Sequence, residues 1–244
     1  MRRRFFVDRF DGRRATLSGD SAHHAGRVLR VAPGQLYELS DGHSIWLARV
    51  EAAKRDAVEF SLLEPVEAPA ATLVSSLLLS IVKFDRFEWA LEKATELGVS
   101  EITPLAASRS EKALVSAAPK RAARWQKILV EAAQQSRRLA APLLHPLARP
   151  ADAFRTAASA DAGAVLLFFS ESPAALPLRG ALEPRRPASR ASLAIGPEGG
   201  WSEDESSSAL TAGFSEASLG PSILRTETAV AAALAVVAYA LRNP

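Results

Sequence analysis

The stretch Leu193-Ala-Ile-Gly-Pro-Glu-Gly-Gly-Trp-Ser-Glu-Asp-Glu205 is typical of a buried strand that ends at Ile195 and passes through a glycine-rich turn into a helix. Ser202 and Glu205 have the spacing of a capping box, which specifies where that helix starts. Glycine permits positive φ angles and a close approach of a ligand to the backbone. Ligands of open α/β sheets bind at the carboxyl ends of strands, so this turn is a candidate binding loop. A tight structural turn explains the same glycines equally well.

Two further loops have a similar pattern. The segment from Ser218 to Ala229 indicates a short strand that reaches Leu219, an irregular turn and a final helix that begins near Thr226. A helix start presents unpaired N–H groups and a positive dipole, and Glu227 fits there simply as a residue that balances the dipole. The segment from Leu167 to Ser172 also ends a buried strand. Three such loops at strand ends predict one composite pocket.

The segments around these loops alternate between strands and helices. Near-continuous apolar runs predict strands buried on both faces of a parallel sheet, at Leu73–Val82, Val99–Leu105, Ala164–Phe169 and Ala191–Gly196. Apolar residues at helical spacing predict helices at Asp85–Leu97, Lys120–Arg138 and Thr226–Leu241. Pro173–Arg190, rich in proline, alanine and arginine, is expected to be a surface excursion. The alternation predicts an α/β fold with a mainly parallel sheet.

Residues 1–67 show the two-residue alternation of short strands instead. The expected strands are Arg4–Val7, Ala15–Leu17, Gln35–Ser40, Ser44–Val50 and Ala57–Leu63, with one short helix at Ser21–Leu29. This pattern predicts a small β-barrel domain. Two prolines in Glu64–Ala71 indicate a linker, which places the domain boundary between residues 70 and 71.

Composition excludes several classes of function. The chain has 244 residues, of which 48% are hydrophobic and 23% charged, as expected for a globular protein with a sizeable core. It has no cysteine, and its four histidines lack metal-ligand spacing, so we expect no metal. The basic start lacks the apolar core of a signal peptide, and Ala229–Leu241 is too short to span a bilayer. We therefore expect a cytoplasmic protein with no membrane partner.

Basic residues are unevenly distributed, although the net charge is only +3. Eight arginines occur within the first thirty residues, and a second basic cluster lies between Lys120 and Arg138. Positive patches attract the phosphate backbone of nucleic acids through Coulomb attraction and counterion release. A solvated surface in an arginine-rich chain explains the distribution equally well, so charge alone does not decide in favour of RNA.

Two motifs in order, Ile195-Gly-Pro-Glu-Gly-Gly200 and Leu219-Gly-x-x-Ile-Leu-Arg-Thr-Glu-Thr-Ala229, are highly specific. Supporting matches are Arg3-Arg4-Phe5-Phe6-Val7, His24-x-x-x-Val28-Leu-Arg30, Lys83-x-x-Arg86-x-Glu88, Lys93-x-x-Glu96-Leu-Gly-Val99 and Ile102-x-Pro104-Leu105. Together they resemble the ribosomal RNA small-subunit methyltransferase E family, which belongs to the SPOUT superfamily of knotted methyltransferases. The resemblance covers nearly the whole chain.

The resemblance implies a PUA-like RNA-binding β-barrel domain in residues 1–70 and a SPOUT methyltransferase domain with a deep C-terminal trefoil knot in residues 71–244. It implies a homodimeric enzyme that uses S-adenosyl-L-methionine to methylate N3 of a uridine in 16S ribosomal RNA, with the small subunit as an assembled ribonucleoprotein. Two departures from the family pattern lie near expected RNA contacts. Ser222 stands where arginine is usual, and Arg137-Arg138-Leu139-Ala140 replaces a Gly-Arg-Asn-Arg run.

The matching positions imply roles for particular residues. Arg225 is the candidate that stabilises an anion or orients the substrate, and Glu227 or Glu198 is the candidate base. The residues implied to hold the cofactor are Leu167, Phe168, Ser170, Glu171, Ile195, Gly196, Pro197, Glu198, Gly199, Gly200, Leu219, Gly220, Ile223, Leu224, Arg225, Glu227, Thr228 and Ala229. The candidate RNA contacts are Arg3, Arg4, Arg9, Arg30, Lys83, Arg86, Lys93 and Arg138, although each alone is more often a surface charge. Trp201 is the tryptophan expected nearest to a ligand.

Other functions remain compatible with the sequence. Related knotted enzymes methylate the ribose 2′-oxygen of RNA, so a ribose 2′-O-methyltransferase is one alternative. A non-catalytic RNA-binding or ribosome-assembly protein that keeps the same fold is a second. A phosphate-binding enzyme is disfavoured, because the chain has no P-loop lysine.

Overall fold

The computed structural model describes residues 3–27, 29–68, 73–183 and 188–241. The chain forms two compact units: the smaller comprises residues 1–70 and 130–141, and the larger comprises residues 71–129 and 142–244. Part of the predicted linker at Glu64–Ala71 lies outside the described residues, as does Val28 of the N-terminal motif match.

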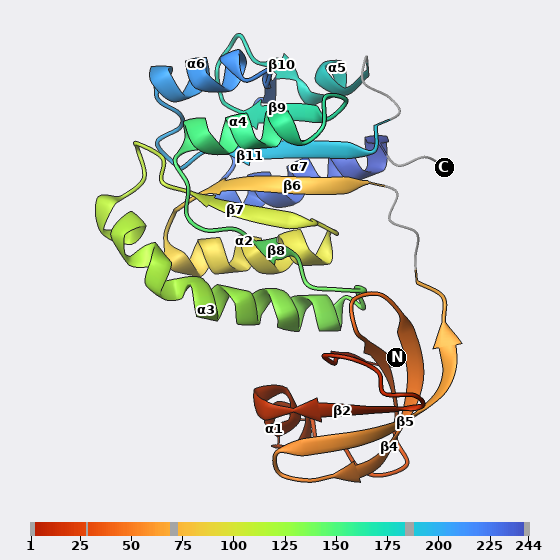
Figure 1. Ribbon diagram of the computed structural model, residues 1–244. Helices are drawn as coiled ribbons and strands as arrows, with labels where there is room; N and C mark the ends of the chain where they lie inside the picture. Colours follow the sequence, from red (N-terminus) through yellow and green to blue (C-terminus); the bar gives the residue numbers. More distant parts are fainter. Residues whose placement is uncertain (1–2, 28, 69–72, 184–187, 242–244) are drawn as a thin grey trace. The chain divides into compact units, whose positions relative to one another are not determined.

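The smaller unit contains a five-stranded sheet and one helix (Figure 1). Its elements are β1 (Arg4–Phe6), β2 (Arg14–Ser18), α1 (Gly19–Arg27), β3 (Leu36–Ser40), β4 (Ile45–Ala53) and β5 (Ala57–Val66). The strand order is β1-β3-β4-β5-β2, in which β1 runs parallel to β3 and the other pairs are antiparallel. The predicted small β domain and its helix are therefore confirmed.

Strand β5 is longer than predicted, because it continues through Pro65 to Val66. Pro65 lies opposite Trp46 of β4, beyond Ser61, which is the last residue of β5 that pairs with β2. Proline lacks a backbone N–H, and at this position only one side of the strand requires hydrogen bonds. The interpretation of residues 64–66 as the start of a linker was therefore wrong.

Alternate side chains of the strands form the core of the smaller unit. Leu39, Val58 and Phe60 are at most 2% exposed and belong to one apolar cluster. Helix α1 closes this cluster with Ala22 and Ala25, which are fully buried. Small residues on this face of α1 allow the helix to pack closely against the strands.

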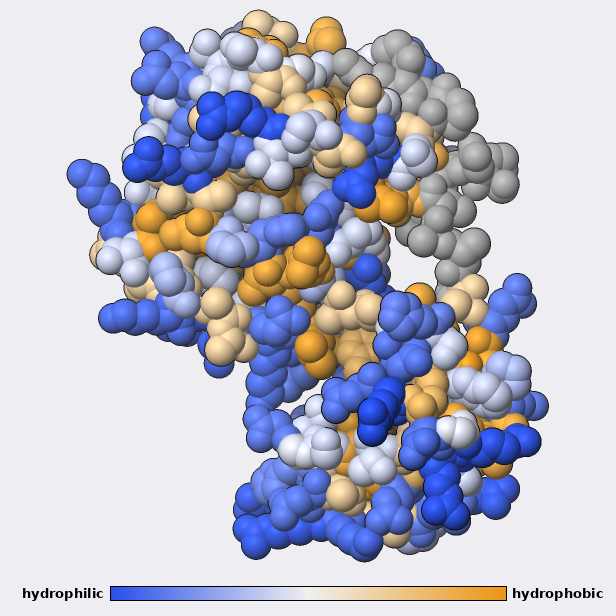
Figure 2. All heavy atoms as spheres, in the orientation of Figure 1, coloured by the Kyte–Doolittle hydropathy of each residue, from blue (hydrophilic) through white to orange (hydrophobic). Residues whose placement is uncertain are grey.

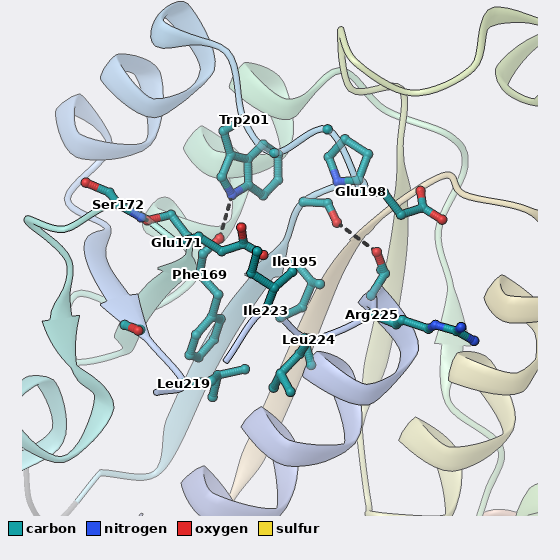
Figure 3. Close-up of a pocket in the computed structure, with 18 of the residues that line it drawn as sticks. Phe169, Glu171, Ser172, Ile195, Glu198, Trp201, Leu219, Ile223, Leu224 and Arg225 are labelled. Atoms are coloured by element: carbon teal, nitrogen blue, oxygen red, sulfur yellow. Dashed lines mark hydrogen bonds between the residues drawn. The ribbon is translucent and has the colours of Figure 1, made fainter. Parts of the chain in front are cut away.

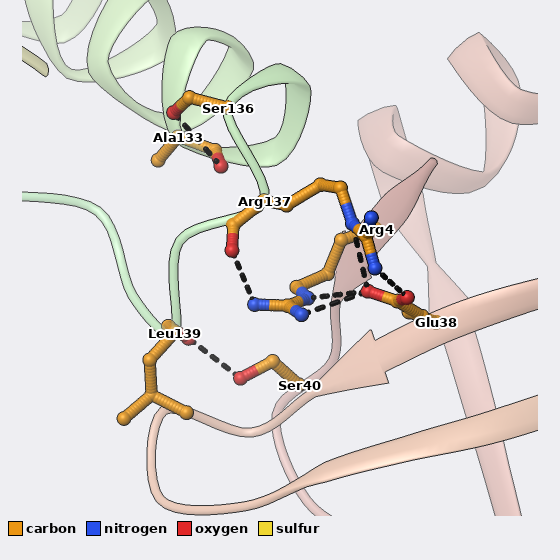
Figure 4. A network of polar contacts seen from close by, with 7 residues as sticks. All are labelled: Arg4, Glu38, Ser40, Ala133, Ser136, Arg137 and Leu139. Carbon is orange, nitrogen blue, oxygen red and sulfur yellow. Dashed lines mark hydrogen bonds and ion pairs between the residues drawn. The ribbon is translucent and has the colours of Figure 1, made fainter. Parts of the chain in front are cut away.

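A buried ion-pair network lies at the β1–β3 edge of the sheet (Figure 4). Arg4 is only 2% exposed, and its Nη2 donates to Glu38 Oε2 at 2.7 Å. Arg137 also pairs with Glu38, and Arg4 donates to the main-chain carbonyl of Arg137. Burial alone raises the pKa of Glu38, but the hydrogen bonds from Arg137 and Arg4 outweigh it and hold the pKa below its usual value.

The segment that follows Arg137 makes a second contact with the sheet of the smaller unit. Ser40 Oγ donates to the carbonyl of Leu139 at 2.5 Å. Residues 130–141 consequently belong to the smaller unit, whereas the sequence analysis assigned them to the second domain. These partners are about a hundred residues apart in the chain, and neither periodicity nor turn composition signals a contact of that kind.

The larger unit contains a seven-stranded sheet with helices on both faces (Figure 1). Its elements are β6 (Val74–Ser80), α2 (Phe84–Glu96), β7 (Glu101–Leu105), α3 (Lys112–Gln135, of which residues 112–129 belong to this unit), β8 (Leu143–Leu144), α4 (Pro150–Ala160), β9 (Val165–Phe169), β10 (Leu176–Pro177), α5 (Leu178–Leu182), β11 (Arg190–Ile195), α6 (Glu203–Thr211), β12 (Ser215–Ser218) and α7 (Thr226–Leu241). The strand order is β10-β12-β9-β11-β6-β7-β8, and the described pairs are all parallel. The predicted α/β fold with a parallel sheet is confirmed.

Successive residues of the central strands belong to two apolar clusters, one on each face of the sheet. Leu77 and Leu79 of β6 lie in a cluster with Trp125 of α3 and with residues of α2, α5 and α7. Leu78, between them, lies in the other cluster with Phe154 of α4 and with Ala209 of α6. Because both faces are covered, these strands are apolar at nearly every position, and the sequence shows continuous apolar runs rather than alternation.

Three helices differ from the sequence analysis. Helix α3 begins at Lys112 and contains Pro119. The predicted helix started only at Lys120, because proline removes a backbone hydrogen bond and normally ends a helix. Helix α4 was not predicted, since its inner face consists mainly of alanine around Phe154. Helix α5 lies within the predicted surface excursion, yet Leu178 and Leu182 are buried in the core, so that interpretation was wrong for this segment.

Most of the arginines near the N-terminus are exposed on the surface of the smaller unit. Hydrophilic side chains predominate on the face of this unit that Figure 2 shows. Its exposed arginines include Arg9, Arg13, Arg14, Arg27 and Arg30. None of the helices in the described part of the chain has the length and apolar character needed to cross a bilayer.

Glu38→Gln should destabilise the smaller unit by about 3 kcal/mol at neutral pH, because it leaves the Arg4 guanidinium buried without an anion. A depressed carboxyl pKa contributes stability that is present above the unfolded-state pKa and is lost as the pH falls through the folded-state value. The difference in unfolding free energy between wild type and variant, measured with urea, should therefore shrink as the pH falls from about 6 to about 3.

Glu59→Gln is a matched control in the same sheet. Glu59 pairs with Lys54, and both side chains are substantially exposed. The control should change the unfolding free energy far less than Glu38→Gln, because water and salt screen an exposed pair. Equal losses for the two variants would contradict a special role for the buried network.

Candidate functional site

The three candidate loops meet at the carboxyl ends of neighbouring strands in the large sheet. Strands β12, β9 and β11 are neighbours, and Phe169 at the end of β9 pairs with Ala217 on one side and Ile195 on the other. Because the strands are parallel, their carboxyl ends lie at the same edge. The loops that follow them line a cavity of about 480 Å³ (Figure 3). This volume lies within the range of small-molecule sites, roughly 300–1,000 Å³.

The glycine-rich loop packs tightly against Trp201. Trp201 Nε1 donates to the carbonyl of Phe169 at 2.9 Å, which joins this loop to the end of β9 (Figure 3). A Cβ atom added to Gly196 would lie 3.1 Å from the Trp201 ring, so only glycine fits without displacing the indole. Gly200 has a φ of +70°, which glycine adopts without strain.

The helix after this loop starts where the sequence predicts. Ser202 Oγ accepts the N–H of Glu205, and Glu205 Oε2 accepts the N–H of Ser202, which completes the capping box. Glu205 Oε1 also accepts the N–H of Ser108 at 2.7 Å. Arg109 Nη1 donates to the carbonyl of Gly199 at 2.9 Å. The segment after β7 therefore supports the glycine-rich loop from outside the cavity.

The loop after β9 is joined to β12. Ser170 Oγ donates to Glu216 Oε1 at 2.6 Å, and the backbone N–H of Ser170 donates to the carbonyl of Ala217 at 3.1 Å. The N–H of Ser172 in turn donates to Ser170 Oγ at 3.1 Å. Ser170 is therefore the residue around which this loop turns.

The third loop leads into α7. Ile223 is 81% exposed, and Leu224 lies beside it in the cavity wall. Thr226 Oγ1 donates to the carbonyl of Gly196 at 3.4 Å, a long hydrogen bond that connects this loop to the glycine-rich loop. The N–H of Ala229 donates to the carbonyl of Arg225 at 2.9 Å, so the helical hydrogen bonds begin at Arg225.

Charged side chains gather at the mouth of the cavity. Arg86 Nη1 of α2 lies 2.9 Å from Glu198 Oε1, and Arg86 Nε lies 4.0 Å from Glu227 Oε1. Glu227 Oε2 is buried and accepts no hydrogen bond from the described residues. The side chain of Arg225 extends to the same side of the cavity as that of Glu198 (Figure 3), and it forms no ion pair within the described part of the chain.

The predicted cofactor residues line the cavity, with the exceptions of Leu167, Phe168, Glu227 and Thr228. Leu167 and Phe168 are fully buried on opposite faces of β9, so their side chains face the core instead of the cavity. Strand β9 ends at Phe169, as the sequence predicts, and the loop follows it.

Two lining residues, Ser206 and Glu216, lie outside the predicted loops. Phe169, Ser172, Ser218 and Thr226 lie within those loops but were not assigned individually to the cofactor. Trp201, the tryptophan expected nearest to a ligand, does line the cavity. Glu216 had a detectable signal, because an acidic residue in the middle of a short strand next to a binding loop is unusual.

The candidate RNA contacts fall into two groups. Arg9, Arg30 and Lys83 are exposed, and Arg3 is partly buried. The others are engaged within the protein: Arg4 with Glu38, Arg86 with Glu198, and Lys93 with Glu92 and Glu96. Arg138 belongs with the second group, because its guanidinium is largely buried, and this burial lowers its pKa. Arg4 does not fit the predicted RNA contact, because its guanidinium is buried and already paired.

Two family models match the chain. Residues 69–238 match the family described as RNA methyltransferase domain, and residues 17–63 match the family described as RNA methyltransferase PUA domain. The fold and the matched families define the class as RNA methyltransferases that carry a PUA domain.

Individual relatives narrow this class. The chain is 33% identical to the Ribosomal RNA small subunit methyltransferase E of Mycobacterium bovis over 96% of this chain and 90% of that protein. It is 32% identical to the protein of the same name from Synechocystis over 91% of this chain and 72% of that protein. The crystal structure of Ribosomal RNA small subunit methyltransferase E from Neisseria gonorrhoeae bound to S-adenosyl methionine superposes with a TM-score of 0.87 at 31% identity, covering 99% of this chain and 98% of that one. The chain belongs to the ribosomal RNA small subunit methyltransferase E family.

Gly196→Ala should destabilise the larger unit by about 1–3 kcal/mol, because the new methyl group overpacks the Trp201 ring, which its hydrogen bond holds in place. Thermal unfolding followed by circular dichroism measures the effect. Gly180→Ala in α5 is the control, since a Cβ atom there meets nothing within 4 Å. An unchanged melting temperature for Gly196→Ala would mean that Trp201 moves freely.

Proposed function

We propose that this protein is an S-adenosyl-L-methionine-dependent enzyme that methylates N3 of a uridine in the 16S ribosomal RNA of the small subunit. The observation that carries the proposal is the single cavity built by three loops at neighbouring strand ends, in a chain that belongs to this family. The relative from Neisseria gonorrhoeae, which aligns with almost the entire chain, has S-adenosyl methionine bound.

The chemistry of the cavity fits this cofactor. Ile195, Leu219 and Leu224 supply apolar wall for a purine ring and an aliphatic chain. Glu171 and Glu216 supply carboxylates for a ligand that carries a sulfonium and an ammonium group. The residues that would hold the cofactor are those of the three loops at 169–172, 195–200 and 219–229.

The cofactor supplies a methyl group bonded to a positively charged sulfur. In the transfer, uridine N3 loses its proton and forms a bond to the methyl carbon, while the methyl–sulfur bond breaks and leaves its electron pair on sulfur. Removal of the N3 proton places negative charge on O2 and O4 of the uracil ring. A positioned cation stabilises such charge, and the protein must also align N3 with the methyl–sulfur bond.

Residues at the cavity mouth suit these tasks. Arg225, exposed and without an ion pair among the described residues, is our candidate for stabilising the uracil anion. Glu227 is the better candidate base, because its buried Oε2 accepts no hydrogen bond from any described residue; Glu198 is the second candidate. Arg86 contacts Glu198 and lies 4.0 Å from Glu227, so we assign it to positioning these carboxylates instead of binding RNA.

The RNA would be held in part by the smaller unit. The PUA family match and the exposed arginines support this assignment, with Arg9 and Arg30 as contacts. Exposed Val236 and Tyr239 on α7 support the proposed homodimer, since exposed apolar groups on a helix favour packing against a second chain. Family membership also supports the trefoil knot, an assembled ribonucleoprotein substrate and a cytoplasmic location.

The first test is the identity of the methylated nucleoside. Small ribosomal subunits from cells that lack the modification should become methylated by the protein and S-adenosyl-L-methionine, and mass spectrometry of the digested RNA should detect 3-methyluridine. A 2′-O-methyl nucleoside would replace the N3 proposal with the ribose alternative. No transfer, together with no calorimetric binding of millimolar S-adenosyl-L-methionine, would support the non-catalytic alternative.

The second test concerns the proposed roles. Arg225→Ala and Glu227→Gln should each lower kcat by about a hundredfold at saturating cofactor, because they remove charge stabilisation and the base. Glu198→Gln should have a smaller effect if Glu227 is the base. Glu203→Gln, at an exposed position in α6, is the control and should leave turnover unchanged. Near-normal turnover of Arg225→Ala or Glu227→Gln would remove the role assigned to that residue.

A further inference from the structure

We infer that Glu216 determines the ligand specificity of the cavity: its carboxylate recognises the positive charge on the sulfur of the methyl donor, and so favours the donor over the product, whose sulfur is neutral. The inference rests on the proposed function, because it takes S-adenosyl-L-methionine as the donor. It adds a residue of β12 to the loops that the family motifs identify.

The position of Glu216 is fixed by the sheet. Side chains alternate along β12, so Ala217 is fully buried in the core while Glu216 and Ser218 line the cavity. Glu216 pairs with Phe168 of β9 in the register of the sheet. A carboxylate on a strand that pairs on both sides is held more rigidly than one on a loop, which suits recognition of a point charge.

Ser170 holds one oxygen of this carboxylate. Its hydroxyl accepts the N–H of Ser172 at 3.1 Å and donates to Glu216 Oε1 at 2.6 Å. A serine hydroxyl has one proton, so this arrangement commits that proton to Glu216. Among the contacts of the described residues, Oε2 of Glu216 has no hydrogen-bond donor, and it remains available to a ligand.

No cation on the described part of the chain balances Glu216. Glu198 is paired with Arg86 at 2.9 Å, whereas Glu171 and Glu216 form no ion pair with described residues. A carboxylate in a partly apolar cavity loses hydration, and a nearby positive charge offsets that cost. Because the described residues supply no such charge to Glu216, the geometry points to a cationic ligand as its partner.

The donor and the product differ in one charge. The donor sulfur has three bonds and is positive, and transfer of the methyl group leaves a neutral thioether, while the ammonium and carboxylate of the amino acid are unchanged. A carboxylate near the sulfur therefore strengthens donor binding and leaves product binding nearly unaffected. Such a preference reduces inhibition of the enzyme by its own product.

The experiment compares the affinity of Glu216→Gln and wild-type protein for S-adenosyl-L-methionine and for S-adenosyl-L-homocysteine, by isothermal titration calorimetry without RNA. The variant should bind the donor about tenfold more weakly, which corresponds to the loss of one modest charge interaction. Its affinity for the product should change less than about twofold, because the product sulfur carries no charge. Equal losses for both ligands would overturn the inference, since Glu216 would then contact a group that the two ligands share. Unchanged affinities would overturn it as well.

Glu171→Gln is the matched control, because Glu171 lines the same cavity but is exposed to solvent. It removes the same charge, and screening by water and salt should keep the change in the donor-to-product affinity ratio below about twofold. A change as large as that of Glu216→Gln would overturn the assignment to Glu216, because only the net charge of the cavity would matter.

Thermal unfolding of the ligand-free variants checks their fold. If Glu216→Gln does not fold, Ser170→Ala keeps the carboxylate but removes the hydrogen bond that fixes it, and should lower the donor-to-product affinity ratio about threefold. An unchanged ratio for Ser170→Ala would then overturn the inference. A wild-type protein that binds neither ligand at millimolar concentration would instead contradict the proposed function.

Discussion

The functional cavity depends on the parallel pairing of β12, β9 and β11. Parallel strands end at the same edge of a sheet, so loops that are far apart in the chain converge there without long connections. Phe169 lies between the other two strand ends, paired with Ala217 and Ile195. Apolar clusters on both faces hold these strands in place, and the loops above them are free to adopt irregular backbones. The hydrogen bond from Trp201 to the carbonyl of Phe169 then joins the glycine-rich loop to the central strand.

Most of this arrangement could be predicted from sequence, because its determinants are local. Continuous apolar runs identify strands covered on both faces, and the Ser202–Glu205 capping box identifies a helix start to the residue. The start of α3 could not be predicted, since its interior proline is a strong local signal that tertiary packing of residues such as Ala118 overrides. The side of β12 on which Glu216 lies depends on strand register, which no local pattern specifies for so short a strand.

The roles of charged residues were the least predictable feature. Arg86 and Arg4 were both candidate RNA contacts, because they stand in motifs that match an RNA methyltransferase family. In the structure their partners are Glu198 and Glu38, each distant in the chain. Whether a guanidinium is available to a phosphate depends on such partners, and composition cannot identify them. The cavity itself was predicted more reliably, since glycines and helix starts constrain the backbone directly.

Arg137 combines a strained backbone conformation with an ion pair. Its φ of +58° lies in the left-handed region, where a residue with a side chain is strained by about 1 kcal/mol and glycine is not. The guanidinium of the same residue pairs with Glu38, so the ion pair accompanies this backbone strain. The side chains at 38 and 137 are therefore coupled in their effect on stability. A variant that lacks the acid at 38 would retain the strain at 137 with nothing to offset it, and glycine at 137 would be the simplest repair.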